Sequence, residues 1–400
     1  MQDLGVNLFV LSAALIAYTI VGYPLALALL TAARRRSPDA REWTPRTVTV
    51  LLAVHDGEAW IARKIESLLA LDYPRSLLRI LVLDDGSTDA TRRIVTQVTD
   101  PRVELVPLPR GGKAKALNAG LARADSDILL FTDVRQPLHP QSLRRLVERF
   151  ADPRIGVVTG ELVIETADRE EESVGLYWRY EKWIRRHQSQ LGSMTGATGC
   201  VYAMRRELAV ALPPDMLVDD MYLPLSAVLR GSRIVVEAAA TAYDHGTTPG
   251  EEFRRKVRTL AGNVQILRAM PRLLVPWNPM GFHFLSHKVI RLLLPYAMLT
   301  MAVSSLLLPS PVRIVMLAAQ GLFYIVALAD LRVPRAWRIK RYSSAARTFV
   351  VLMTAALCAP PASLLKGGTV WRPAAAGAHR PAAVSEGREA HWHSAASAVR

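Results

Sequence analysis

The sequence predicts an α/β domain with a mostly parallel sheet, flanked by helices that cross a membrane. Short apolar runs alternate with helix-like stretches between residues 45 and 270, which is typical of a doubly wound parallel sheet. Long uncharged runs lie near both ends of the 400-residue chain. Half of the residues are hydrophobic, which excludes a disordered chain, and two cysteines are too few for a disulfide scaffold.

The first uncharged run covers residues 6–30, is long enough to span a bilayer, and is followed directly by three arginines. We therefore expect a transmembrane anchor over residues 1–36, with its arginine end in the cytoplasm. About three more membrane helices are expected within residues 289–366. They are predicted by three uncharged runs, residues 292–308, 314–329 and 349–365. The loop at residues 331–347 is basic and is therefore expected in the cytoplasm. The sequence thus predicts four crossings, with both termini of the chain outside.

The net charge of +15 is unevenly distributed along the chain. Residues 1–36 carry +2 and residues 289–400 carry +10, whereas residues 37–288 hold 34 bases and 31 acids. Basic residues beside a bilayer gain about 1 kcal/mol each from an anionic leaflet. The charge therefore predicts a membrane partner and argues against nucleic acid. We also expect an amphipathic interfacial segment over residues 271–288 and a disordered tail over residues 367–400.

The middle domain begins with a β-branched apolar run that is typical of a buried strand. Five such strands are predicted, over residues 47–54, 78–83, 103–106, 128–132 and 155–159. Helices are expected between them, over residues 58–71, from 87 or 88 to 98, and over 113–124 and 140–150. Ligands of parallel sheets bind at the carboxyl ends of strands. The glycine-rich dinucleotide fingerprint and the P-loop motif are both absent from the sequence.

Carboxylates follow two of these strands. Asp84 and Asp85 come after the second strand, and Asp133 comes after the fourth. Each is equally well explained as a turn or helix-cap residue. Asp219 and Asp220 lie between apolar residues, where burial would raise a carboxyl pKa and suit it to act as a general base. Three acidic sites in one α/β domain fit metal-assisted chemistry on a phosphorylated substrate.

Seven segments together indicate a family. They are VLLAVHDGE, LVLDDGSTD, GGKAKALNAG, ILLFTDVRQ, GATGCVYAMRREL, VDDMYLP and EFRRKVRTLAGN. In this order, over about residues 47–290, the chain resembles the membrane-bound family-2 glycosyltransferases, which include cellulose synthase-like and hyaluronan synthase-like enzymes. The resemblance implies a multi-pass protein of the cell membrane, whose GT-A domain, residues 45–270, faces the cytoplasm. It also implies inverting transfer from a nucleotide-sugar, usually a UDP-sugar, to a glycan or lipid-linked acceptor, for envelope or extracellular polysaccharide.

The resemblance further implies roles for individual residues. Nucleotide-sugar binding is implied for Asp56, Asp84, Asp85, Lys113, Arg255 and Arg258. Asp133 matches the first acid of a D-x-D motif and would hold Mg²⁺ or Mn²⁺. Asp220, with Asp219 beside it, matches the final acid of a triplet that serves as the general base. The basic residues around Arg258 also suit a helix at the membrane surface, and both interpretations stay open.

The sequence departs from the family pattern at several positions. Arg135 replaces the second acid of D-x-D, and His245 is a candidate to assist the metal, although a surface or core role is the simpler interpretation. Residues 255–259 lack the Gln and Trp of the family's Q-x-x-R-W motif, which weakens an assignment of processive polymer synthesis. Three aromatic residues form either an acceptor platform or part of the core: Tyr177, Trp178 and Trp183.

Two other functions are also compatible with the sequence. A polyprenyl-phosphate glycosyltransferase would use the extra basic residues to bind the acceptor phosphate. A membrane scaffold or transport subunit would keep the fold without catalysis. The donor sugar, the acceptor and any partner that exports the product are not specified by the sequence.

Overall fold

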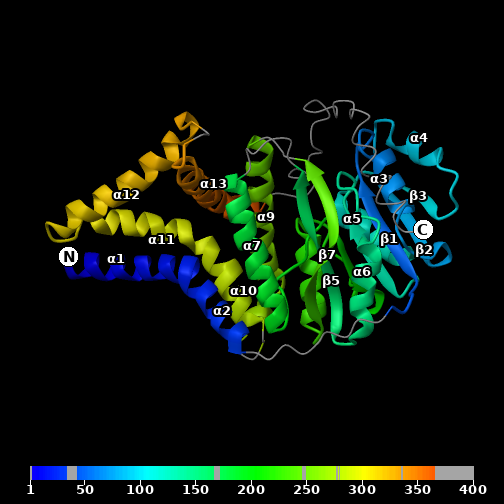
Figure 1. The fold of residues 1–400 in the computed structure, drawn as a ribbon, viewed down its shortest axis with the longest axis horizontal. Coiled ribbons are helices and arrows are strands. Elements are labelled where there is room, and N and C mark those ends of the chain that lie inside the picture. Colours follow the sequence, from blue (N-terminus) through cyan, green and yellow to red (C-terminus); the bar gives the residue numbers. More distant parts are fainter. Residues whose placement is uncertain are drawn as a thin grey trace.

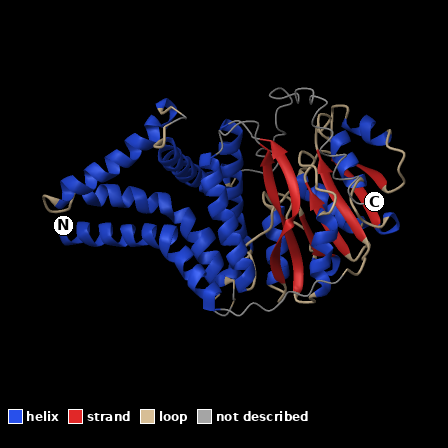
Figure 2. Ribbon diagram, in the orientation of Figure 1, coloured by secondary structure: helices blue, strands red, loops and turns tan. Residues whose placement is uncertain are grey.

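The computed structural model describes residues 2–33, 43–165, 172–245, 249–275, 278, 280–334 and 337–364. Figure 1 shows a sheet domain at one end of the molecule and long helices extending from the other. Figure 2 shows that the strands are confined to the first of these halves. The tail over residues 367–400, expected to be disordered, lies outside the described residues.

Within the described residues, seven strands form one sheet in the order β3-β2-β1-β4-β6-β5-β7. Their bounds are Val48–Val54 for β1, Leu78–Asp85 for β2, Val103–Leu108 for β3, Ile128–Thr132 for β4, Ile155–Glu165 for β5, Tyr202–Arg205 for β6 and Arg233–His245 for β7. Strands β1 to β4 pair in parallel, as do β5 and β7. Only β6 runs antiparallel to its neighbours, β4 and β5. The mostly parallel α/β sheet predicted from the sequence is therefore confirmed.

Helices cover both faces of the sheet (Figure 1). Their bounds are Ile61–Leu69 for α3, Thr91–Thr96 for α4, Lys113–Arg123 for α5, Ser142–Glu148 for α6, Glu172–Leu191 for α7, Asp219–Val228 for α8 and Pro249–Ala269 for α9. Alternate residues of β1 enter two separate cores. Leu51 packs on the face with α5 and α8, and Leu52 packs on the face with α3 and α6. Burial on both faces explains why the first strands read as continuous apolar runs.

Four helical stretches of the described chain are long and apolar enough to cross a membrane. They comprise α1 (Gln2–Ala17) with α2 (Tyr23–Ala33), α10 (Gly281–Phe284) with α11 (Ile290–Ser305), α12 (Val312–Ala329) and α13 (Lys340–Ala362). π-Helical segments join α1 to α2 and α10 to α11. The second stretch begins at Gly281, inside the segment for which an interfacial position was expected. In the described part of that segment, the 3₁₀ turn Pro271–Leu274 precedes it.

These helices pack against one another and against the sheet domain. α1 lies beside α11 (Figure 1), and Gly5 approaches Leu307 beyond the end of α11. α2 packs on α7, where Tyr23 and Leu27 contact Ile184. Many of their large apolar side chains are exposed, Leu328 by 77%, and together these make a surface suited to lipid.

Candidate active site

Charged residues from four elements meet at the carboxyl edge of the sheet. Asp85 ends β2, Asp133 directly follows β4, and Lys113 is the first residue of α5. Asp219 and Asp220 form the first turn of α8. The parallel arrangement of β1, β2 and β4 brings Asp85 and Asp133 to one edge of the sheet, as expected for carboxylates that follow parallel strands.

Lys113 joins two of the carboxylates. Its Nζ lies 2.8 Å from Asp133 Oδ1 and 3.1 Å from Asp219 Oδ1. Burial alone would lower the pKa of Lys113, but the charges of Asp133 and Asp219 outweigh it and raise that pKa. Burial would raise the pKa of Asp133, but Lys113 lowers it below its usual range. Lys113 is therefore a cation and Asp133 an anion at neutral pH.

Asp220 differs from its neighbour because it has no ion-pair partner among the described residues. Burial and the negative charge of Asp219 raise the pKa of Asp220 to about 6. A turn covers the carboxylate closely: a Cβ on Gly199 would lie 3.0 Å from Asp220 Oδ2. The Ala197 amide donates to the Asp220 carbonyl at 2.8 Å, which fixes this turn against the start of α8. A carboxylate with this pKa is ionised at pH 7 and can accept a proton.

The two arginines predicted on α9 have different surroundings. Arg258 faces Asp133 and Asp220, and its buried Nε has no hydrogen-bond partner in the described structure. Arg255 instead pairs with Glu252 one turn earlier on the same helix. The structure therefore brings Arg258 to the carboxylates and gives Arg255 a contact within α9.

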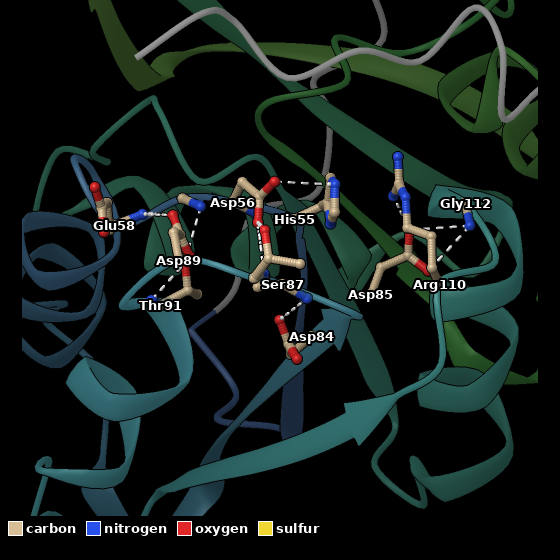
Figure 3. Close-up of polar contacts among 12 residues, drawn as sticks. His55, Asp56, Glu58, Asp84, Asp85, Ser87, Asp89, Thr91, Arg110 and Gly112 are labelled. Carbon is tan, nitrogen blue, oxygen red and sulfur yellow. Dashed lines mark hydrogen bonds and ion pairs between the residues drawn. The ribbon is translucent and has the colours of Figure 1, made fainter.

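Figure 3 shows the loops that follow β1 and β2. The Asp56 amide donates to Ser87 Oγ at 3.0 Å, and the Thr88 amide donates to Asp56 Oδ1 at 2.8 Å. The amide of Glu58 donates to Asp89 Oδ2 at 2.9 Å, so a second contact joins the same two loops. Burial opposes ionisation of Asp56, but the Thr88 amide lowers the pKa of its carboxyl. Asp56 is thus held as a partly exposed anion at the edge of the site.

Asp84 and Asp85 are both fully buried and bound by their own chain. Asp84 pairs with Arg92 and accepts the Ser87 amide at 3.2 Å. Asp85 pairs with Arg110 and accepts two glycine amides, from Gly111 at 2.6 Å and from Gly112 at 3.0 Å (Figure 3). Asp85 thereby fixes the loop that leads into Lys113. In this structure the two carboxylates position loops, and their direct contact with a nucleotide stays a prediction.

The position of the second D-x-D acid is occupied by a cation. Arg135 Nη2 lies 2.5 Å from Asp244 Oδ2, at the end of β7. The side chain of His245 lies outside the described residues. Within the described chain, no three His, Cys, Asp or Glu side chains gather as metal ligands. Asp133 still fits a divalent cation, because Mg²⁺ sites commonly use one or two carboxylates together with substrate phosphates.

The aromatic residues of α7 do not form a common platform. Tyr177 accepts a hydrogen bond from Arg291 at 2.9 Å and packs among the apolar helices. Trp178 packs against the core of the sheet, and Trp183 packs against α2. Successive helical residues differ in direction by about 100°, so these three positions face different neighbours. These contacts favour the core interpretation, and an acceptor role for the three residues stays a prediction.

Three basic residues at the site were missed by the sequence analysis. Lys64 of α3 is 1% exposed, and its Nζ donates to Thr132 Oγ1 at 2.6 Å, directly before Asp133. Arg185 of α7 donates to Thr198 Oγ1 at 2.8 Å in the turn over Asp220. Lys288 precedes α11 and has Asp220 among its charged neighbours. Their side chains meet the site only through the tertiary fold, although Lys288 is recognisable as a base beside an uncharged run.

Comparison with known proteins agrees with this architecture. Residues 49–212 match the family model described as Glycosyl transferase family 2. A poly-beta-1,6-N-acetyl-D-glucosamine synthase from Staphylococcus aureus is 25% identical over 241 residues, which is 58% of this chain and 58% of that protein. A beta-monoglucosyldiacylglycerol synthase from Synechocystis is 32% identical over 143 residues, covering 33% of this chain and 30% of that protein. This chain therefore spans less than two thirds of the length of either relative.

A solved structure has the same overall fold. It is a mannosyltransferase from Pyrobaculum calidifontis, in complex with GDP-Man and Mn²⁺, with a TM-score of 0.70 at 23% sequence identity. The match covers 89% of this chain and 99% of the mannosyltransferase, and at this identity it establishes the fold. The chain therefore carries a GT-A domain that matches the Glycosyl transferase family 2 model over residues 49–212.

Proposed function

We propose that this protein is an inverting, metal-dependent glycosyltransferase that works at a membrane surface. It moves a sugar from a nucleotide-sugar, with UDP-sugars as the first candidates, to a glycan or lipid-linked acceptor. The observation that carries the proposal is the environment of Asp220. Its carboxylate has a pKa of about 6 and lies beside the cluster of Lys113, Asp133 and Asp219.

The reaction follows from this arrangement. An acceptor hydroxyl gives its proton to the Asp220 carboxylate as its oxygen bonds to the anomeric carbon of the sugar. The bond from that carbon to the nucleoside diphosphate breaks on the opposite face, so the anomeric configuration inverts. Lys113 and the unpartnered Nε of Arg258 offer positive charge to the departing diphosphate.

A divalent cation, Mg²⁺ or Mn²⁺, completes the proposed donor site, and Asp133 is the residue that would hold it. When bound, the cation neutralises the diphosphate as it leaves. The mannosyltransferase of the same fold was solved with GDP-Man and Mn²⁺, which supports this assignment. Asp56, at the edge of the loops after β1 and β2, would contact the nucleoside. Asp85 would place Lys113 by holding the preceding loop.

The acceptor class is suggested by the relatives. One is named for a polysaccharide and the other for a glucosyl diacylglycerol, and both products form on hydroxyl groups. A hydroxyl acceptor requires a general base, which supports the role of Asp220. We place the product in envelope or extracellular polysaccharide or glycolipid synthesis, and transfer to polyprenyl phosphate is the second candidate.

We propose that the catalytic domain, residues 45–270, faces the cytoplasm, and that α1–α2, α10–α11 and α12 cross the bilayer. The contacts of α13 argue against a fourth crossing. At its start, Ser343 donates to Asp330 at the end of α12 at 2.7 Å. At its end, Arg268 of α9 donates to Ser363 at 3.3 Å. Because α12 returns toward the catalytic domain (Figure 1), both ends of α13 lie on the same side, and α13 would lie along the cytoplasmic surface.

A reporter fused after residue 400 tests the orientation, because three crossings place it in the cytoplasm and four place it outside. The activity is tested with membranes that contain the protein and a panel of radiolabelled nucleotide-sugars. Sugar incorporation that requires Asp220 supports the enzyme, and equal incorporation by Asp220→Asn contradicts the proposed base. A chain that transfers no sugar with any donor would instead be the non-catalytic membrane subunit.

A further inference from the structure

Two cations near Asp220 have no carboxylate partner of their own among the described residues. Lys288, in the π-helical segment Leu285–Val289, has Asp220 among its charged neighbours, and Arg185, on α7, contacts the turn that covers Asp220. The charged neighbours of Lys288 are Arg185, Arg291, Glu181 and Asp220. Two of these four repel it. Among the described residues, no carboxylate lies within ion-pair distance of either Arg185 or Lys288.

The nearest acid on the same helix is already neutralised. Glu181, one turn before Arg185, accepts Arg291 Nη1 at 2.5 Å and lies 3.3 Å from His287 Nε2. Arg185 itself donates to a neutral hydroxyl, Thr198 Oγ1, at 2.8 Å. The charges of Arg185 and Lys288 are therefore not neutralised by an ion pair. They lie near Asp220, the proposed base, which must remain free to accept a proton.

The position of Arg185 is fixed relative to the base. Thr198 precedes Gly199, whose added Cβ would lie 3.0 Å from Asp220 Oδ2. The Thr198 amide donates to Thr159 Oγ1 at 2.8 Å, which anchors the turn to β5. Arg185 is thus bound to the turn that covers Asp220, whereas Lys113 engages Asp133 and Asp219.

A third cation faces the same space with an unused donor. Arg258 has Asp133 and Asp220 among its charged neighbours, and its buried Nε has no hydrogen-bond partner in the described structure. A buried donor without an acceptor is unfavourable, because it has lost its hydrogen bonds to water. Like charges gathered at partly buried positions are also unfavourable. The diphosphate of the donor would satisfy Arg258, and a second anion, brought by the acceptor, would relieve the repulsion at Arg185 and Lys288.

We propose that Arg185 and Lys288 bind a phosphate group of the acceptor and so present a neighbouring hydroxyl to Asp220. The inference rests on the proposed function and deepens it: the acceptor is an anionic lipid whose reactive hydroxyl lies beside a phosphodiester. The hydroxyl oxygen bonds to the anomeric carbon, its proton passes to Asp220, and the bond to the nucleoside diphosphate breaks with its electron pair. The acceptor phosphate itself forms and breaks no bond.

The test compares two lipids that share acyl tails and a glycerol hydroxyl, phosphatidylglycerol and diacylglycerol. The full chain is assayed in detergent with a nucleotide-sugar that it consumes. We expect kcat/KM to be at least tenfold higher for phosphatidylglycerol. Lys288→Met and Arg185→Gln should each raise the KM for phosphatidylglycerol about tenfold, abolish the preference, and leave the KM for the nucleotide-sugar within twofold.

Lys182→Gln is the matched control. It removes a cation from the same helix, but Lys182 is paired with Glu161 at 3.1 Å, so the lipid preference should persist. The inference is overturned if the wild type does not distinguish the two lipids, if the variants change the donor KM instead, or if only neutral sugars are accepted. Glycosylation of polyprenyl phosphate on its phosphate, with both hydroxyl lipids unused, also overturns it. A chain that consumes no nucleotide-sugar at all refutes the proposed function, a distinct result from consumption without a phosphate preference.

Discussion

The ammonium of Lys113 lies 2.8 Å from the Asp133 carboxylate, and this ion pair joins the start of α5 to the end of β4. The pair holds the positive charge of Lys113 at the place where the proposed reaction releases a diphosphate. Lys113→Met should therefore lower kcat/KM for the nucleotide-sugar by about 10²- to 10³-fold. The control is Lys115→Met, which removes an exposed lysine of the same helix and should retain the wild-type rate. Equal rates for Lys113→Met and the wild type would show that Lys113 has only a structural role.

Metal removal tests the assignment of Asp133. Treatment with EDTA should abolish sugar transfer, and Mg²⁺ or Mn²⁺ should restore it, because the diphosphate needs a cation to leave. Asp133→Asn should raise the metal concentration that gives half-maximal activity by at least tenfold. Full activity in chelator would rule out a metal-dependent reaction.

Asp85 is predicted to act through the loop that it holds. Asp85→Asn removes a buried charge that pairs with Arg110 and accepts the Gly111 and Gly112 amides. We expect a stability loss of about 1–3 kcal/mol and a higher KM for the nucleotide-sugar. Thermal unfolding in detergent and donor saturation curves measure the two effects. A raised KM without any loss of stability would instead indicate direct contact with the nucleotide.

Lys64 should make stability depend on pH. Burial lowers the pKa of Lys64 from 10.5 to about 7. Between these values the unfolded chain binds the proton and the folded chain does not, so stability rises with pH across this range. In Lys64→Met this part of the rise should disappear, whereas Lys115→Met should retain it. Unfolding midpoints at pH 7 and pH 9 measure the difference, and identical pH slopes in wild type and Lys64→Met would contradict it.

Three of the five strands that the sequence predicted share one property. β1, β2 and β4 are buried on both faces, so each is a continuous apolar run. The long β7 was not predicted. The four-residue β6 also escaped notice, because it is stabilised by pairing with β4 and β5, far away in the sequence. Non-local pairing leaves no local periodicity to detect.

The candidate site divides in the same way. The carboxylates at strand ends could be predicted, because parallel strands bring their carboxyl ends to one edge. The pairing of Arg135 with Asp244 could not be predicted, because the two residues are 109 positions apart in the sequence. The position of Lys288 near the site could not be predicted either, because it comes from a different part of the chain. For α7, the aromatic content allowed either an acceptor platform or a core role, and helical geometry directs Tyr177 and Trp178 to different neighbours.

The most direct test of the account is the turnover of Asp220→Asn with an accepted nucleotide-sugar and acceptor. Asparagine keeps the size of the side chain but cannot take a proton, so kcat should fall by about 10³-fold while the donor KM changes little. Asp125→Asn, at a carboxylate that is 89% exposed, should match the wild type. In the wild type, kcat should rise with pH through about 6 as Asp220 ionises. Wild-type turnover by Asp220→Asn would contradict the assignment of Asp220 as the general base.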